Sequence, residues 1–192
     1  MPRVFGPCRR RRHLMIRRIL HLGEDELRNS SETITTIDDD LRTLVRDMFE
    51  TMYKNNGVGL AAPQVGVNKR LFIIDTGENP ITFINPEILE TSGKETCNEG
   101  CLSLPGLQET VTRAKWVKAR ATDLDGTTFE IEADGLLARA IQHENDHLDG
   151  VLFIDRISKA RRLQIRHELE IIEAGGKIEY EDDDSDDGVD AA

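Results

Sequence analysis

The feature that most constrains the fold is His-Glu-Asn-Asp-His at residues 143–147, an H-E-x-x-H pattern that requires a helix around it. Residues i and i+4 of an α-helix lie on one face, so the rings of His143 and His147 can bind the same metal ion. Glu144 follows the first histidine and can reach a water molecule bound to that ion. Apolar residues at helical spacing over residues 136–148, followed by a glycine, predict the helix and its end.

Two histidines do not complete such a site, because a catalytic zinc-like centre has three protein ligands and one open position. Downstream, Glu168 and Glu170 offer a thermolysin-like arrangement, but they lie in a charge-rich stretch that is typical of a solvated helix face. Upstream, Cys101 offers a thiolate, a strong ligand for zinc or ferrous iron. We prefer Cys101 as the third ligand, and Cys97 is the rival thiol. The alternative to a metal site is a surface helix with two solvated histidines.

Three segments of the chain together resemble the motifs of one family. Residues 57–64 read Gly-Val-Gly-Leu-Ala-Ala-Pro-Gln, residues 99–103 read Glu-Gly-Cys-Leu-Ser, and residues 142–150 read Gln-His-Glu-Asn-Asp-His-Leu-Asp-Gly. In this order and at these separations they resemble peptide deformylase, the metalloenzyme that removes the N-formyl group from nascent bacterial and organellar polypeptides. The resemblance covers approximately residues 15–160.

The resemblance implies a catalytic role for each residue that matches a motif. The implied metal ligands are Cys101, His143 and His147. Glu144 would be the general acid/base, and Gln64 and the backbone N–H of Leu102 would bind the oxyanion. None of these positions departs from the family pattern.

The resemblance also implies which residues border the substrate: Gly59, Leu60, Gly100 and Leu102. One difference lies outside the motifs. After Pro105 the chain reads Gly-Leu-Gln-Glu-Thr, where some relatives carry an arginine that helps to hold the peptide. This difference affects the details of peptide binding and leaves the chemistry unchanged.

The implied activity is that of a metal-dependent hydrolase that removes the formyl group from the N-terminal methionine of new polypeptides and releases formate. Metal-bound water would be the nucleophile. The cofactor would be one divalent metal ion: two histidines and a cysteine suit Fe(II), Zn, Ni or Co, and the resemblance favours Fe(II). The implied partners are formyl-methionyl nascent peptides, with transient proximity to the ribosome. The rival functions are another metal-dependent peptidase or amidase and a non-catalytic protein that binds peptides or ribosomes.

Charge is distributed unevenly along the 192 residues. The net charge of −11 argues against a protein that binds a specific nucleic acid. Residues 1–18 nevertheless contain seven arginines and no acid, and residues 181–192 contain seven acids and no base. We therefore expect a basic, disordered arm over residues 1–14, a single catalytic domain over residues 15–175, and an acidic, disordered tail over residues 176–192.

The composition also bears on location. No apolar run approaches the roughly 20 residues of a membrane span, so no membrane partner is expected. Three cysteines do not suggest a disulfide framework, and a thiolate ligand favours a reducing compartment. We expect a bacterial cytoplasmic protein that starts functionally at Met15. The alternative is an organellar protein whose arginine cluster is part of a transit peptide.

The remaining patterns predict the fold class. A helix capped by Asp38 is expected to end at residues 55–57. Strands are expected over residues 70–75, 81–89, 111–122 and 127–132, and a C-terminal helix over residues 158–173. These elements predict an α+β domain with mostly antiparallel sheets packed around a central H-E-x-x-H helix, an additional helix in the N-terminal half and a C-terminal helix.

Overall fold

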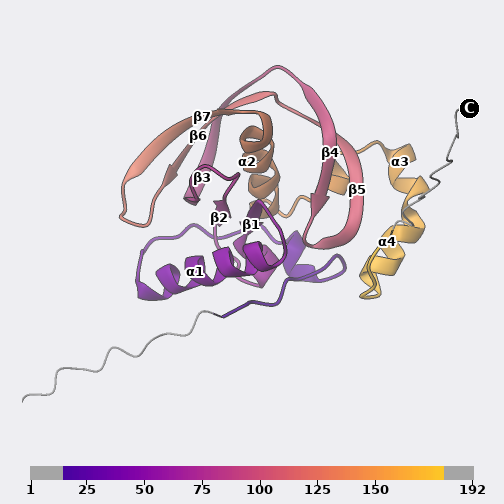
Figure 1. Cartoon of the computed structure of the whole chain (residues 1–192), viewed down its shortest axis with the longest axis horizontal. Coiled ribbons are helices and arrows are strands. Elements are labelled where there is room, and N and C mark those ends of the chain that lie inside the picture. The colour runs from indigo at the N-terminus through magenta and orange to yellow at the C-terminus, as the bar shows by residue number, and fades with distance from the viewer. Residues whose placement is uncertain (1–14, 180–192) are drawn as a thin grey trace, which may run out of the picture.

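Two antiparallel sheets and four α-helices account for most of the computed structural model, which describes residues 15–179 (Figure 1). The larger sheet has five strands in the order β1-β2-β3-β6-β7, and the smaller one pairs β4 with β5. The strands are β1 (Gly59–Ala61), β2 (Leu71–Ile74), β3 (Ile81–Ser92), β4 (Glu95–Cys101), β5 (Leu104–Arg113), β6 (Trp116–Thr122) and β7 (Thr128–Asp134). The predicted α+β class is therefore confirmed.

Helices and short 3-10 turns connect and cover these strands. The α-helices are α1 (Asp39–Lys54), α2 (Gly135–Leu148), α3 (Lys159–Gln164) and α4 (Arg166–Glu173). The 3-10 turns are η1 (Asp25–Arg28), η2 (Ala62–Val65) and η3 (Phe153–Asp155). Among the described residues, none of the helices has the length and apolar character that a membrane crossing requires.

Helix α1 forms for the reasons that its sequence suggests. The side chain of Asp38 accepts a hydrogen bond from the backbone N–H of Leu41 at 2.8 Å and so caps the first turn. After the helix, Asn56 adopts a left-handed conformation with φ of 55°, which turns the chain toward β1. The buried apolar stripe of α1 packs against β1 and β2 and consists of Leu41, Leu44, Val45, Met48 and Met52.

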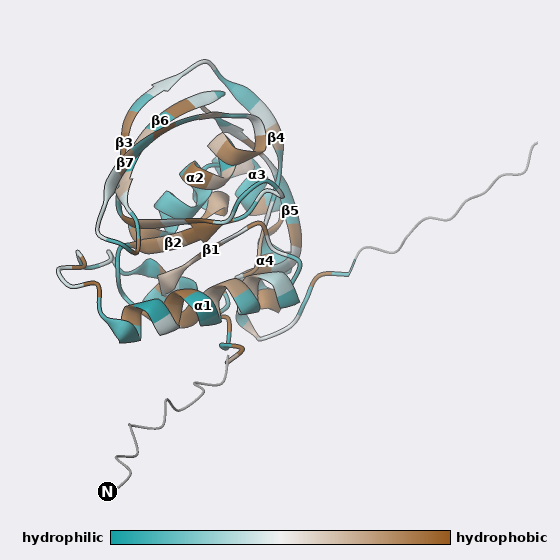
Figure 2. Cartoon of the chain, turned by 60° about the vertical axis from the view of Figure 1, so that its left-hand side comes forward, coloured by the Kyte–Doolittle hydropathy of each residue, from teal (hydrophilic) through white to brown (hydrophobic). Residues whose placement is uncertain are grey.

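Helix α2 carries the H-E-x-x-H pattern and lies within the curve of the larger sheet, where it contacts β1, β2, β6 and β7 (Figure 2). Its apolar residues Ala138, Ile141 and Leu148 belong to the hydrophobic cluster that β2, β3 and β6 also form. The helix ends before Gly150, which has φ of 71° and packs closely against the backbone of Arg28. Because α2 is enclosed in this way, its polar residues Glu144, Asp146 and His147 are buried.

The strand predicted over residues 111–122 is wrong in one respect, because it is two strands. β5 ends at Arg113 and β6 begins at Trp116. The break occurs where the side chain of Gln142 on α2 bonds to both backbone groups of Ala114, at 3.0 Å and 2.9 Å. These bonds replace the ladder hydrogen bonds that would have continued the strand. The predicted set of strands also omitted β1 and β4.

The predicted C-terminal helix needs a correction. The helix expected over residues 158–173 is interrupted at Ile165, whose side chain is buried in a hydrophobic cluster with Leu104, Phe153 and Ile172. Beyond the domain boundary expected after residue 175, Ile178 is buried in the same cluster and its N–H donates to the carbonyl of Pro105 at 3.0 Å. The expected basic arm and residues 180–192 of the expected acidic tail lie outside the described residues.

Candidate active site

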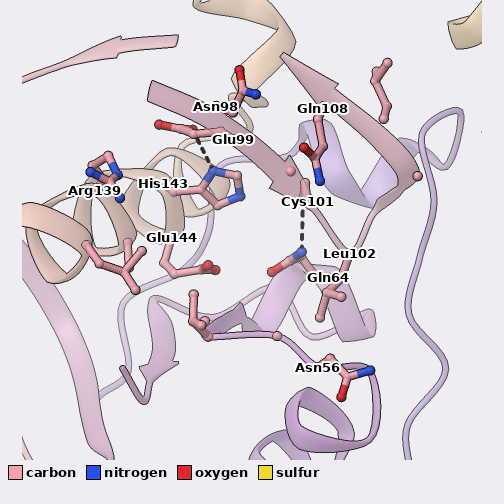
Figure 3. Close-up of a pocket in the computed structure, with 18 residues that line it drawn as sticks. Asn56, Gln64, Asn98, Glu99, Cys101, Leu102, Gln108, Arg139, His143 and Glu144 are labelled. Carbon is pink, nitrogen blue, oxygen red and sulfur yellow. Dashed lines mark hydrogen bonds and ion pairs between the residues drawn. The ribbon is translucent and has the colours of Figure 1, made fainter. Parts of the chain in front are cut away.

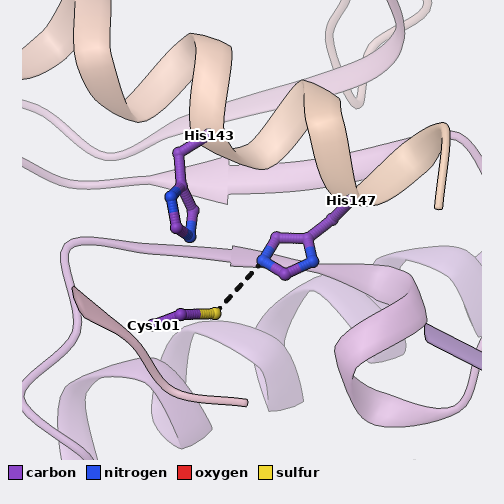
Figure 4. A group of neighbouring side chains, drawn as sticks. All are labelled: Cys101, His143 and His147. Atoms are coloured by element: carbon purple, nitrogen blue, oxygen red, sulfur yellow. Dashed lines mark hydrogen bonds between the residues drawn. The ribbon is translucent and has the colours of Figure 1, made fainter. Parts of the chain in front are cut away.

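Cys101, His143 and His147 converge at the junction of the two sheets (Figure 4). Cys101 is the last residue of β4, and the two histidines lie one turn apart on α2. One potential ligand atom from each residue lies within 4.8 Å of the other two. The Sγ of Cys101 is 3.3 Å from Nε2 of His147. The strand end and the helix face thus bring the three predicted ligands together.

The alternative ligands are not part of this group. The Sγ of Cys97 is 3.4 Å from a guanidinium nitrogen of Arg139, and Cys97 is absent from the His/Cys/Asp/Glu cluster that the described chain presents. Both Glu168 and Glu170 lie in α4, where Glu168 is half-buried and Glu170 is exposed and pairs with Arg166. Neither a downstream glutamate nor the second thiol therefore reaches the two histidines.

The orientation of His143 is set from outside the group. Its Nδ1 lies 3.1 Å from a carboxylate oxygen of Glu99, which leaves Nε2 for the side of the ring that faces Cys101. Glu99 is itself bound by the guanidinium of Arg113 through two hydrogen bonds. Burial raises the pKa of Glu99, but the bonds from His143 and Arg113 outweigh it and lower the pKa to about 2. Glu99 is therefore ionised near neutral pH and can accept a hydrogen bond from the imidazole.

His147 is held in the neutral form. Burial lowers the pKa of its imidazole well below the usual value, and the charges of His143 and Arg113 act in the same direction. Its Nδ1 is buried and has no hydrogen-bond partner among the described residues. A neutral imidazole is the form that binds metals.

Glu144 points into the pocket beside these residues (Figure 3). Only 4% of the residue is exposed, and its Oε2 is buried without a hydrogen-bond partner in the described chain. Burial is the main cause that raises the pKa of Glu144 to about 7, and it outweighs the opposing charges of His143 and Arg113. A carboxyl group with this pKa can both accept and donate a proton near neutral pH.

Gly59 explains how Glu144 is accommodated. A Cβ built on Gly59 would overlap Oε1 of Glu144 and lie 2.9 Å from its carboxyl carbon. The φ of Gly59 does not lie in the left-handed region, so its backbone conformation does not require a glycine. The close approach of Glu144 does require one, because a side chain would occupy the same space. Strand β1 is therefore packed directly against the carboxylate.

Gln64 lies in η2 with 1% of its surface exposed. Its Oε1 accepts the backbone N–H of Ala61 at 2.8 Å, which fixes the orientation of the amide. The Nε2 group then lies 3.5 Å from Cys101 Sγ (Figure 3). It also lies 3.2 Å from Ser103 Oγ. An N–H donor is thus fixed next to the sulfur.

These residues line a pocket of about 390 Å³. Most of the predicted site residues border it: Gly59, Gln64, Gly100, Cys101, Leu102, His143 and Glu144. Leu60 is not among the lining residues, and its side chain is fully buried in the cluster against α1. Neighbouring strand residues point to opposite sides, so Leu60 faces away from the pocket that Gly59 borders.

The pocket also contains residues that sequence reasoning did not select. They include Asn56, Asn98, Gln108 and Arg139 (Figure 3). Arg139 donates to a carboxylate oxygen of Glu95 at 3.0 Å. A polar residue on a helix normally indicates a solvated face, so the sequence offered no signal for Arg139.

Comparisons with known proteins agree with this geometry. The family model described as polypeptide deformylase matches residues 16–163. A peptide deformylase of Clostridium botulinum is 58% identical over 146 residues, which cover 76% of this chain and 99% of that protein. A peptide deformylase of Acidobacterium capsulatum is 47% identical over 169 residues, which cover 85% of this chain and 99% of that protein.

Solved structures give the same result for the fold. The crystal structure of a peptide deformylase from Legionella pneumophila has a TM-score of 0.78 and 46% identity, and the match covers 81% of this chain and 94% of that one. The crystal structure of peptide deformylase from Thermus thermophilus has a TM-score of 0.79 and 37% identity, with 83% and 99% coverage. The three motifs, the fold that joins them and the identity to these relatives all lead to one conclusion: the chain belongs to the peptide deformylase family.

Proposed function

We propose that this hydrolase removes the formyl group from the N-terminal methionine of new polypeptides by a metal-dependent reaction that releases formate. The observation that carries the proposal is the convergence of one thiol and two imidazoles beside the buried carboxyl group of Glu144. Deformylation of nascent peptides is the known role of the family, and the residue roles below are our proposals for this chain.

The donor set fits a divalent metal ion. A thiolate and two imidazoles are ligands that Fe(II), Zn, Ni and Co accept, and Fe(II) is our preferred ion. We propose Cys101, His143 and His147 as the ligands, with the carboxylate of Glu99 fixing the ring of His143. When bound, the metal supplies Lewis-acid activation of a water molecule near neutral pH.

Glu144 acts as the general acid/base. Its raised pKa of about 7 allows it to accept a proton from the attacking water and to deliver that proton to the departing α-amine. The unpartnered Oε2 is available for these transfers, since no neighbouring group in the described chain occupies it.

Two donors stabilise the negative charge that develops on the formyl oxygen. The Nε2 of Gln64 is held by the bond between its Oε1 and the N–H of Ala61, and the backbone N–H of Leu102 is the second donor. Each such donor contributes about 3 kcal/mol in the transition state. Gly59 and Gly100 leave a narrow approach that fits a formyl group, which has no side chain on its carbonyl carbon.

The proposed substrates are formyl-methionyl nascent peptides, which imply transient proximity to the ribosome in the bacterial cytoplasm. We further propose that one catalytic domain begins at Met15 and extends to the segment around Ile178, which is packed against the core.

A formate-release assay tests this function. Anaerobically purified protein loaded with Fe(II) or Co(II) is expected to hydrolyse formyl-Met-Ala-Ser and to leave acetyl-Met-Ala-Ser intact. Cleavage of unblocked peptides would support the rival peptidase, and metal-loaded protein without turnover of any formyl peptide would support the non-catalytic binder. Cys101→Ser should lose metal and activity, whereas Cys97→Ser should retain both, because of the two cysteines in the described chain Cys101 alone lies with the histidines.

A further inference from the structure

A row of ion-paired side chains leads from His143 to the protein surface. Glu99 accepts hydrogen bonds from Nδ1 of His143 and from Nε and Nη2 of Arg113. The remaining Nη1 of Arg113 donates to Oδ2 of Asp146 at 2.8 Å. Arg156 then binds both carboxylate oxygens of Asp146 through Nε and Nη2. We call these four residues, Glu99, Arg113, Asp146 and Arg156, the outer row.

Three members of the outer row are buried and the last one is not. The residues Glu99, Arg113 and Asp146 are 8%, 6% and 6% exposed, whereas 48% of the Arg156 side chain is exposed. Their formal charges alternate, so the row as a whole is neutral. Buried charges are tolerated when each one is paired and hydrogen-bonded, and removing one partner leaves an uncompensated charge.

Arg156 decides how Arg113 is shared between two carboxylates. With Arg156 in place, Asp146 has a bidentate partner of its own, and Arg113 can keep two of its donors on Glu99. Without Arg156, the buried Asp146 would retain only Arg113 as its ionic partner in the described chain. The guanidinium would then be drawn toward Asp146, and Glu99 would lose part of the support that fixes its carboxylate against His143.

We propose that Arg156 is a positioning residue for the metal centre, which acts through Asp146, Arg113 and Glu99 to fix the ring of His143. The inference rests on the proposed metal site. Outer partners of metal-binding histidines set the orientation and basicity of the ring, and their loss lowers metal affinity. The outer row also restrains α2, because Asp146 is a residue of this helix and directly precedes His147.

The neighbouring Arg162 provides a matched control. Its side chain is 43% exposed and pairs with Asp155, which Arg28 also binds. Arg162 thus resembles Arg156 in exposure and in having an aspartate partner, but within the described chain no hydrogen bond or ion pair joins its pair to the outer row.

The test uses full-length protein loaded with Co(II), whose visible spectrum reports ligand geometry. Affinity for Co(II) is measured by competition with a chromophoric chelator in the wild type, Arg156→Gln, Arg156→Lys and Arg162→Gln. We expect Arg156→Gln to weaken Co(II) binding about tenfold and to shift the d–d bands. Arg156→Lys should fall between it and the wild type, because lysine keeps the charge and loses the bidentate geometry. Arg162→Gln should match the wild type in both measurements.

The outcomes separate this inference from the proposed function. If Arg156→Gln lowers thermal stability but leaves Co(II) affinity within about twofold and the spectrum unchanged, Arg156 is an ordinary surface ion pair and the inference is wrong. An equal effect of Arg162→Gln would also overturn it, because the effect would not depend on the outer row. A wild-type protein without a thiolate-to-cobalt absorption band would overturn the proposed metal site, and the inference with it.

Discussion

Adding one methyl group at Gly59 should displace the carboxyl group of Glu144 without changing any residue that we assign to the chemistry. The new Cβ of Gly59→Ala would lie 2.9 Å from the carboxyl carbon, whereas ordinary van der Waals contact begins at 3.4 Å. The nearer oxygen would have to withdraw further, by roughly 1 Å, and a misplacement of that size costs about 100-fold in rate. This loss corresponds to about 3 kcal/mol of transition-state stabilisation.

The assay is formate release from formyl-Met-Ala-Ser, with metal content measured on the same samples. We expect Gly59→Ala to lose about 100-fold in kcat and to keep its metal, since the variant leaves Cys101, His143 and His147 unchanged. Glu144→Asp withdraws the carboxylate by one methylene and should also be slow. The double variant should be no slower than Glu144→Asp alone, because the overlap is already relieved. Near-normal turnover in Gly59→Ala, or losses that multiply in the double variant, would refute the steric argument.

Three further predictions follow from other contacts. Gln64→Leu should lower kcat by about 10² to 10³ with unchanged metal content; an unaltered kcat would remove its oxyanion role. In metal-free protein, the pKa of Glu99 is lowered from 4.5 to about 2, chiefly by bonds that outweigh burial, so its ionised form stabilises the fold above pH 4.5. That contribution, about 3 kcal/mol at most, is lost as the pH falls toward 2. The difference in unfolding free energy between wild type and Glu99→Gln should therefore shrink over this range, and a difference independent of pH would contradict the assignment. Truncation after Gly176 removes the buried Ile178 and should cost about 2 kcal/mol in urea unfolding, whereas deletion of residues 181–192 should leave activity intact. Equal stability of the two truncated proteins would show that the Ile178 contact contributes nothing.

Local patterns predicted the parts of the fold that local physics determines. The spacing of apolar residues in α1 and α2 follows the helical period, and the caps at Asp38 and Gly150 lie where the sequence predicts them. Strand β5 was harder to delimit, because its apolar alternation runs on into β6. The break comes from Gln142, a residue 28 positions further along the chain, and no local pattern contains that information.

The residues of the site likewise fall into those that the sequence predicted and those that depend on the tertiary structure. Helical spacing alone placed His143 and His147 on one face. Thiolate chemistry and then the family motifs favoured Cys101, which the fold brings to them from β4. The roles of the outer row were not predicted, because a charged residue in a strand or helix usually indicates a solvated position. Arg113 and Asp146 are buried only because they neutralise each other and their neighbours, a condition that depends on the tertiary structure.

The most direct test of the central claim is X-ray absorption at the zinc edge of zinc-loaded protein. We predict one sulfur at about 2.3 Å and two nitrogens at about 2.0 Å from the metal, with the sulfur lost in Cys101→Ser and retained in Cys97→Ser. A coordination sphere of oxygens and nitrogens without sulfur in the wild type, or a sulfur that persists in Cys101→Ser, would contradict the proposed metal centre.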